Sequence, residues 1–326
     1  MLNSIIFSIN AVFPLVILML FGFFIKREKL GLFKNPKDFF NQVDRLVFNI
    51  ALPVYIFNEL SGTNAEKIFD IKLVIYCVSG ILLSFFLLLL ITSFLIKKKT
   101  SRGAFIQGVF RGNFAILGVP LAGNLFGQAG SSMAALIISF AIPLFNILAV
   151  VTLEIHADNN DINSDAKSQN SALKIFRGII TNPLIIAVIL ALPVMFFKIS
   201  LPAVVQKSVN YIANMSTPLA LISLGAGIEL QVLRAKAKLS LTASILKTVI
   251  APLFFVIPAV LLGFRDAALV IIFVLFSTPT AVSSYIMAKN MKSDYELAGQ
   301  IVALTTIICP VTIFIGSLIL KSMGLI

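Results

Sequence analysis

Residues 73–96 read LVIYCVSGILLSFFLLLLITSFLI, a run of 24 residues without a charged side chain. About 20 consecutive apolar residues suffice for an α-helix to cross the roughly 30 Å hydrocarbon layer of a bilayer. Residues 5–25, 134–153 and 239–262 form runs of similar length and character. These runs predict an all-α, polytopic membrane protein.

The composition of the whole chain indicates the same class. Hydrophobic residues make up 59% of the 326 residues, charged residues make up 12%, and the mean hydropathy is +1.01. A soluble domain carries about 25% charged residues, so this chain could not cover its surface in water. The net charge of +12 does not indicate nucleic-acid binding, because Lys and Arg lie between the apolar runs and no nucleic-acid motif is present. The expected partner is the lipid bilayer, whose anionic headgroups attract such charges.

Ten apolar segments can be drawn as membrane spans, at residues 5–25, 39–60, 73–96, 103–126, 132–154, 178–197, 206–228, 239–262, 267–288 and 297–320. A polar stretch, residues 156–171, separates the fifth span from the sixth. The connections on the side of this stretch hold 17 Lys and Arg, and those on the other side, termini included, hold 6. Cytoplasmic loops carry the excess of Lys and Arg. Both termini are therefore expected outside the cytoplasm, with the polar stretch inside.

Prolines repeat along the chain with offsets of 169, 165, 159 and 167 residues, in the pairs Pro14 and Pro183, Pro53 and Pro218, Pro120 and Pro279, and Pro143 and Pro310. The stretch NIALP at residues 49–53 also matches NMSTP at residues 214–218. A repeated unit of five spans must enter the membrane the second time in the opposite orientation, which is the inverted-repeat architecture of secondary transporters. We predict one repeat at residues 1–155, a cytoplasmic linker at 156–175 and a second repeat at 176–326.

Two spans contain polar residues and a proline at their middles, RGNFAILGVP at residues 111–120 and FSTPTAVSS at residues 276–284. Proline inside a helix removes a backbone hydrogen bond and clashes with the preceding turn, but it fits the first turn of a helix. We therefore predict that the fourth and ninth spans are broken helices that cross at the bilayer midplane. Pro120 and Pro279 would begin the second half-helices, with Ser277 or Thr278 as a cap.

The start of each half-helix carries unpaired N–H groups and the positive end of the helix dipole, which favour an anion. We predict a substrate site without a fixed countercharge, with Ser284 nearby, formed by Asn113, Gly118, Pro120, Thr278, Pro279, Thr280 and Ser283. The alternative is a pair of ordinary proline kinks whose hydroxyls bond to their own turns. The chain has no Walker sequence, H-E-x-x-H or Cys/His cluster. We expect no cofactor, no metal site and no enzymatic activity.

Charged residues inside spans are functional candidates. Arg111 lies two positions from Asn113, about 200° round a regular helix, so we expect it to reach the membrane surface or to pair with Asp44, unless the helix unwinds at Gly112. Asp44 either forms an interfacial pair with Arg45 or has a structural or coupling role. Lys247 either reaches the surface or has a structural or coupling role. Asn49 and Asn214, the matched asparagines of the two repeats, are further structural or coupling candidates.

The stretch RGNFAILGVPL at residues 111–121 resembles the R-x-N-x-x-x-x-G-x-P-L pattern of the auxin efflux carrier family. Four more stretches are similar to this family and follow its order: VFNIALP at 47–53, LKTVIAP at 246–252, TPTAVSSYIMA at 278–288 and LTTIICP at 304–310. The resemblance therefore extends through the whole chain.

The resemblance implies ten helices with both ends outside and a crossing of broken helices four and nine. It implies a scaffold of helices 1, 2, 6 and 7 beside a moving unit of helices 3–5 and 8–10. Family substrates are organic anions, auxin in plants and dicarboxylates such as malonate or malate in bacteria. The asparagine before G-x-P contacts the substrate carboxylate, which by position is Asn113. Bacterial members of the family imply a location in the inner cell membrane. This chain departs from the family pattern in one respect, because no carboxamide side chain lies beside Pro279.

We therefore expect a secondary active or facilitative transporter of a small mono- or dicarboxylate, working by elevator-like alternating access. An anion channel is the first alternative, but it needs a continuous wet path with rings of similar groups. A sodium- or proton-coupled symporter of the bile-acid-carrier type is the second, weakened by the lack of a midplane Asp or Glu. Both a monomer and a homodimer are compatible with the sequence.

Overall fold

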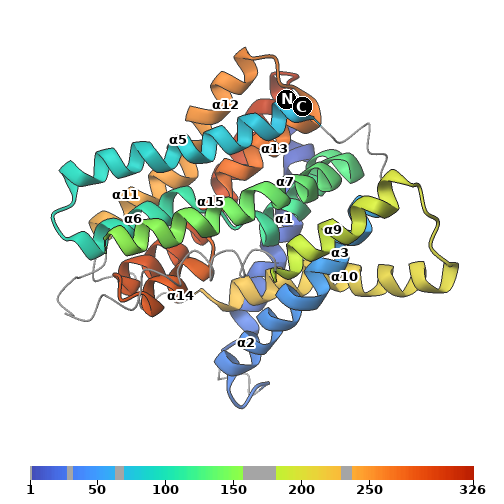
Figure 1. Cartoon of the computed structure of the whole chain (residues 1–326), viewed down its shortest axis with the longest axis horizontal. Helices are drawn as coiled ribbons and strands as arrows, with labels where there is room; N and C mark the ends of the chain where they lie inside the picture. Colours follow the sequence, from blue (N-terminus) through green and yellow to red (C-terminus); the bar gives the residue numbers. More distant parts are fainter. Residues whose placement is uncertain (1, 28–31, 63–69, 157–180, 229–236) are drawn as a thin grey trace.

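The computed structural model describes residues 2–27, 32–62, 70–156, 181–228 and 237–326, and these ranges form helices and short connections without a strand element (Figure 1). The all-α fold is confirmed. Apart from His156, the expected linker lies outside the described residues. The helical elements are α1 (Leu2–Ile25), α2 (Pro36–Leu46), η2 (Val47–Ala51), α3 (Leu52–Ser61), α5 (Ile71–Leu95), α6 (Lys99–Phe110), η3 (Phe114–Gly118), α7 (Val119–Ile155), α9 (Pro183–Phe196), α10 (Ala203–Ala226), α11 (Ala237–Ile245), η5 (Leu246–Ile250), α12 (Ala251–Leu261), α13 (Asp266–Ser277), α14 (Ser283–Asn290) and α15 (Tyr295–Ser322).

Five helical stretches within the described ranges are long and apolar enough to cross a membrane, namely Leu2–Ile25, Ile71–Leu95, Phe114–Ile155, Ala237–Leu261 and Tyr295–Ser322. Helices α9 and α13 are shorter apolar helices. Many large apolar side chains of these helices point outward, as Phe94, Leu261 and Phe197 do, with 83%, 82% and 78% of their surface exposed. Such surfaces are stable only against lipid. The division into ten spans and two inverted repeats stays a prediction.

Polar residues begin several of these helices. Asp70 accepts hydrogen bonds from the backbone N–H groups of Lys72 and Leu73 at the start of α5. Asn182 and Asp294 cap α9 and α15 in the same way. Each cap satisfies N–H groups that the helix leaves unpaired and contributes about 1 kcal/mol.

Three π-helical segments, η2, η3 and η5, each end two residues before a proline, and these prolines are Pro53, Pro120 and Pro252. In each case the N–H after the segment bonds to the carbonyl five residues earlier. A proline lacks its N–H and its ring pushes against the carbonyl four residues before it. The wider π turn removes this clash and keeps the chain helical, so these three prolines do not break their helices.

Helix α7 contains the turn between the fourth and fifth expected spans. Phe126 and Gly127 leave helical geometry, and Gly127 has φ of +62°, which glycine adopts without strain. A Cβ on Gly130 would lie 2.2 Å from the carbonyl oxygen of Ala122. The two parts of α7 therefore pack directly against each other beyond the turn.

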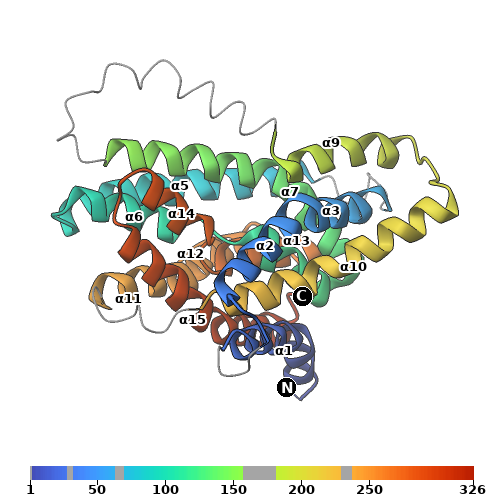
Figure 2. The same ribbon diagram turned by 90° about the horizontal axis from the view of Figure 1, so that it is seen from below.

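The helices pack as two groups. Helices α1, α2, α3, α9 and α10 form one group, the α1/α10 group, and α5, α6, α7 and α11–α15 form the other, the α7/α15 group. Figures 1 and 2 both show α3, α9 and α10 together on one side and α5, α6, α11 and α14 on the other. These groups contain the helices that the resemblance assigns to the scaffold and to the moving unit. Movement of one group against the other stays a prediction.

Backbone contact through glycine holds the α1/α10 group together. A Cβ on Gly22 of α1 would lie 1.8 Å from the carbonyl oxygen of Ile222, and one on Gly225 of α10 would lie 1.8 Å from that of Met19. Small residues allow membrane helices to approach this closely, which increases their van der Waals contact.

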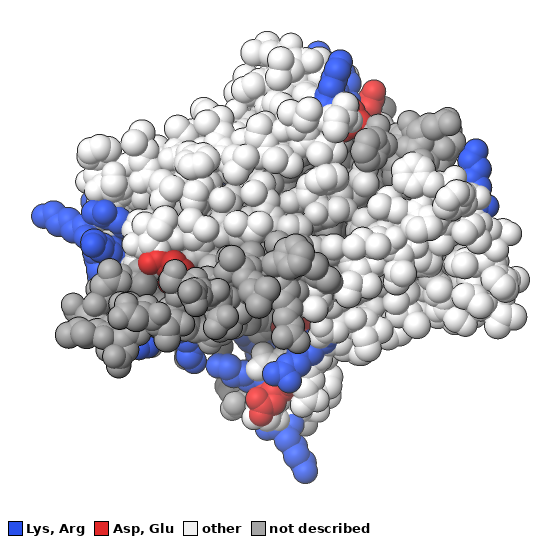
Figure 3. Space-filling model, viewed as in Figure 1, with Lys and Arg blue, Asp and Glu red and all other residues white. Residues whose placement is uncertain are grey.

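The two chain ends lie on the same side of the molecule (Figure 1). Lys321 near the end of α15 lies 4.5 Å from the ring centre of Phe7 in α1. At the other end of α15, Asp294 accepts a hydrogen bond from Ser101 of α6, and His156 lies beside Gly103 of α6. His156, the last described residue before the rest of the expected linker, therefore lies at the end opposite to the termini. Lys and Arg lie along the rim of the face in Figure 3, mostly on its left and lower sides.

Candidate functional site

Two non-helical segments cross in the middle of the α7/α15 group. Helix α6 ends at Phe110 and helix α13 ends at Ser277, as expected for the fourth and ninth spans. The N–H of Asn113 donates to the carbonyl of Pro279 at 2.7 Å, and the N–H of Ala281 donates to that of Arg111 at 3.2 Å. This antiparallel bridge pairs backbone groups that lipid could not satisfy.

The fourth and ninth expected spans do not break at the residues that Pro120 and Pro279 predicted. After Arg111, Gly112 and Asn113 the helix restarts at Phe114, so Pro120 lies in the second turn of a continuous helix and does not begin it. Pro279 lies within the break, and α14 begins at Ser283 without a side-chain cap. The expectation that both prolines begin half-helices is wrong. The π turn at 114–118 accommodates Pro120, whereas the extended backbone at Thr278 follows from its place before Pro279.

Side chains from neighbouring elements satisfy the carbonyls and N–H groups at the crossing. The Thr280 hydroxyl donates to the carbonyl of Gly108 in α6 at 2.5 Å. The N–H of Thr280 donates to the Thr305 hydroxyl of α15 at 3.1 Å. Thr278 and Thr280 are fully buried, and their hydrogen bonds with protein hold the crossing together.

Asn113, like Ser277 and Ser284, departs from this pattern. Its side chain is 6% exposed, it stands immediately before the first residue of η3, and its Nδ2 has no hydrogen-bond partner. An unpaired buried amide donor costs about 1–3 kcal/mol. A carboxylate that accepted this hydrogen bond would remove the cost and would lie at the positive end of the helix dipole.

Arg111 is buried, with 7% of its surface exposed. Its guanidinium donates to the side-chain oxygen of Asn146 in α7 at 2.7 Å and to the sulfur of Met287 in α14. The expectation that Arg111 reaches the membrane surface or pairs with Asp44 is therefore wrong. Unwinding at residues 111–113 sends the Arg111 side chain toward α7 and α14, a direction that a regular helix would not allow.

Lys247 is also buried, with 1% of its surface exposed, within the π segment η5. Its Nζ lies 3.2 Å from the position that a Cβ on Gly112 would take. Lys247 therefore does not reach the surface, and its ammonium lies at the crossing of the broken helices. The structure thus places a lysine amino group at a crossing that was expected to hold polar, uncharged groups.

The other candidates lie in different surroundings. Gly118 packs on the ring of Phe114, because a Cβ on Gly118 would lie 2.5 Å from a ring carbon. Ser283 is exposed, whereas its neighbour Ser284 is buried with an unpaired hydroxyl. Exposed side chains also belong to Asn49, whose amide bonds to the Arg45 carbonyl at 2.8 Å, and to Asn214 and Asp44.

Two residues at the site were not singled out from the sequence, and Gly112 was considered only as a place where the helix could unwind. Gly112 is required there, because a Cβ would lie 2.7 Å from the Thr278 hydroxyl. Asn146 and Thr305 are polar residues within the apolar fifth and tenth expected spans. This polarity is the feature of the sequence that could have indicated them as site residues.

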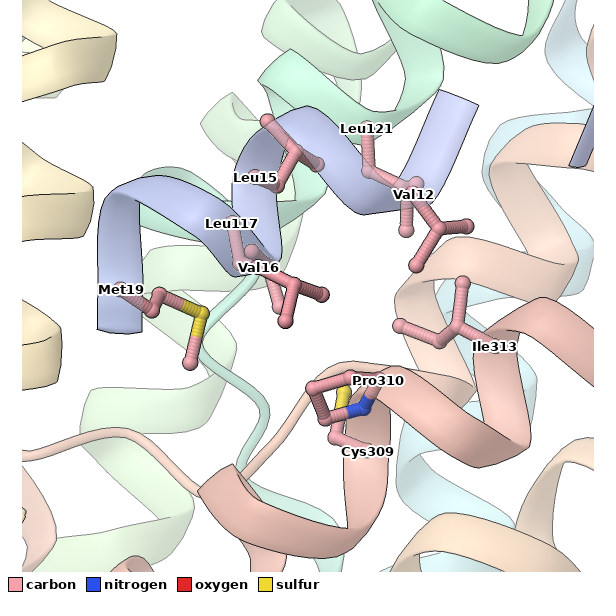
Figure 4. Close-up of a pocket in the computed structure, with 9 residues that line it drawn as sticks. All are labelled: Val12, Leu15, Val16, Met19, Leu117, Leu121, Cys309, Pro310 and Ile313. Carbon is pink, nitrogen blue, oxygen red and sulfur yellow. The ribbon is translucent and has the colours of Figure 1, made fainter. Parts of the chain in front are cut away.

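A small apolar pocket lies beside the crossing, between α1, η3 with α7, and α15. Figure 4 shows its lining side chains, which are Val12, Leu15, Val16, Met19, Leu117, Leu121, Cys309, Pro310 and Ile313. Leu117 and Leu121 lie four residues apart on one face of the helix that restarts one residue after Asn113. The pocket lies where the α1/α10 group meets the α7/α15 group. Within the described residues, no group of three or more His, Cys, Asp and Glu could hold a metal ion.

Known proteins are similar to this chain in sequence along most of its length. The chain is 24% identical over 303 residues to an uncharacterized transporter of Methanocaldococcus jannaschii, covering 91% of this chain and 94% of the relative. It is 24% identical over 283 residues to a Rhizobium meliloti protein named "Putative malonate transporter", covering 86% of each. It is 22% identical over 287 residues to an uncharacterized transporter of Escherichia coli, covering 87% and 88%.

Residues 7–316 match the family described as membrane transport protein. This match includes both broken helices, the pocket and every motif quoted above. The chain therefore belongs to the membrane transport protein family, which is the auxin efflux carrier family that its motifs resemble, and it is an integral membrane transporter.

Proposed function

We propose that this transporter carries a small organic anion across the membrane by alternating access. The observation that carries the proposal is the unpartnered, buried Nδ2 of Asn113 at the start of the second half-helix. It offers a donor where the helix dipole favours negative charge. The substrate carboxylate accepts from Asn113, and neighbouring N–H groups at the start of η3 add to the attraction.

The charges near the crossing support an anion over a cation. Lys247 is buried there, and no hydrogen bond or ion pair joins it to a carboxylate among the described residues. A buried charge without a countercharge costs several kcal/mol. An anion that enters the crossing lowers this cost, whereas a cation raises it.

The apolar pocket bears on the kind of anion. All nine of its lining residues are apolar or weakly polar, so a second carboxylate in the pocket would lose hydration without gaining a partner. A monocarboxylate with a short apolar body fits these walls better than a dicarboxylate. The name of the Rhizobium meliloti relative, which mentions malonate, supports a dicarboxylate instead. The binding experiment should therefore include both a monocarboxylate and a dicarboxylate.

The position of the pocket supports a carrier over a channel. It lies between the two helix groups, so sliding of the α7/α15 group along the α1/α10 group would carry the site from one membrane face to the other. A channel needs a continuous wet path lined by similar groups, and the polar atoms described here gather at a single crossing.

Binding of the purified protein to matched acids and amides tests the proposal. We expect a monocarboxylate such as isovalerate, or a dicarboxylate such as malonate, to raise the melting temperature, because ligands that bind the folded state stabilise it. Isovaleramide and malonamide should leave the melting temperature unchanged. An amide that stabilised the protein as well as its acid would contradict the assignment of an anion site.

We also expect both termini outside the cytoplasm and the α5–α6 connection inside, from the 17-to-6 distribution of Lys and Arg. The native Cys77 and Cys309 are buried, so introduced cysteines report alone. A membrane-impermeant maleimide should label Met323→Cys in intact cells and Lys98→Cys only in opened membranes. Labelling of both from one side would contradict the topology.

A further inference from the structure

We infer that the Lys247 ammonium is a built-in cation at the crossing, which takes the place of a coupling sodium ion and makes anion binding independent of sodium. The inference rests on the proposed function. The anion proposed there binds at the start of η3, whereas Lys247 lies at the end of α13 in the same crossing. Lys247 thus has a positioning and coupling role, without contact between Lys247 and the substrate.

The position of the ammonium is defined by Gly112. The Nζ of Lys247 and the carbonyl oxygen of Leu275 each lie 3.2 Å from the point where a Cβ on Gly112 would be, and the Thr278 hydroxyl lies 2.7 Å from it. The amino group of η5 and two oxygen atoms from the end of α13 therefore lie around one point. Gly112 keeps this point open because it has no side chain.

The crossing has a negative pole and a positive pole. Helices α6 and α13 end there, at Phe110 and Ser277, and each helix end carries about half a negative elementary charge. Segment η3 and helix α14 begin there and carry the opposite partial charges. Lys247 lies at the end of α13, whereas Asn113 lies at the start of η3.

Transporters with broken helices commonly bind sodium at such C-terminal ends, through the unwound carbonyls. Here a lysine amino group from η5 of another helix stands at this position. Its protonated form repels a sodium ion that approaches the same place. The lysine therefore replaces sodium at the negative pole.

Three variants, compared with wild type, test the inference, with the anion that best stabilises wild type as the probe. Lys247→Met keeps much of the side-chain volume but removes the charge, and Lys247→Arg keeps the charge. The control is Lys238→Met, which removes an exposed lysine of α11 immediately before the expected span that contains Lys247. Affinity and melting temperature are measured in sodium chloride and in choline chloride at equal ionic strength, because screening depends on ionic strength.

Wild type, Lys247→Arg and Lys238→Met should bind the anion equally in both salts, within about twofold. Lys247→Met should lose about tenfold in affinity in choline, the scale of a helix-end charge interaction in a partly buried position. Sodium should then recover part of this affinity. Sodium should also raise the melting temperature of anion-free Lys247→Met and leave that of wild type unchanged.

Two results would overturn the inference. One is a requirement of wild type for sodium, and the other is wild-type affinity of Lys247→Met in choline. If Lys247→Met does not fold, the salt dependence of wild type and of Lys247→Arg decides. If wild type binds no anion in either salt, the proposed function fails. The effect of sodium on the melting temperatures of the anion-free proteins then still tests whether Lys247 replaces sodium.

Discussion

Asn113→Ala is expected to bind the substrate anion about ten- to a hundredfold more weakly than wild type. This corresponds to about 1–3 kcal/mol, the value of a hydrogen bond to a charged partner. The anion-free variant should melt at the wild-type temperature or above it. The Nδ2 of Asn113 has no partner in the protein, so its removal breaks no hydrogen bond and relieves an unsatisfied buried donor.

This combination separates a binding residue from a structural one. Asn113→Asp is nearly isosteric and places a carboxylate beside the substrate, so it should weaken anion binding more than alanine does. Asn3→Ala, at an exposed amide at the start of α1, is the control and should change neither property. A lower melting temperature of Asn113→Ala with an unchanged anion-induced shift would show that Asn113 supports the fold and not the substrate.

The membrane class and the two broken helices follow from short-range features of the sequence. Uncharged runs such as residues 73–96 identify membrane helices because lipid forces every backbone group to bond within its own helix. Polar residues in the middle of such a run, as at residues 111–113 and 278–280, mark places where this rule is broken. For this reason the sequence located both breaks and placed Asn113 beside one of them.

The exact position of each break depends on tertiary contacts, which a span read alone does not contain. Pro120 was expected to begin a helix, but the π turn of η3 absorbs it. The break lies instead at Gly112, where Thr278 of another broken helix and Lys247 of η5 need the space. Proline shows where a helix needs adjustment, whereas the packing partners decide whether it bends or breaks.

The buried charges show the same limit. A lysine about two turns from the end of a span is expected to extend toward the headgroups. Lys247 remains buried beside Gly112, at the place where α6 and α13 end. These helix ends belong to segments more than 100 residues before and about 30 residues after Lys247. No spacing rule within the eighth expected span could have indicated them.

Arg111→Ala is expected to act on the stability of the crossing and to leave the intrinsic affinity for the anion nearly unchanged. The guanidinium joins the broken segment to Asn146 of α7 and to Met287 of α14. Its removal leaves a cavity and an unpaired amide oxygen, for a loss of about 2–5 kcal/mol. Binding is measured well below the melting temperature, so that only folded protein contributes.

A double-mutant cycle with Asn146→Ala tests whether Arg111 acts through Asn146. The hydrogen bond of 2.7 Å between them predicts a coupling energy of about 1.5–3 kcal/mol, the range for a hydrogen bond to a charged group. The double variant should therefore be less destabilised than the sum of the single variants. Loss of anion binding in folded Arg111→Ala, with Asn146→Ala unaffected, would place the guanidinium on the substrate. The anion would then bind to a fixed charge on the α14 side of the crossing, and Asn113 would be left with the secondary role.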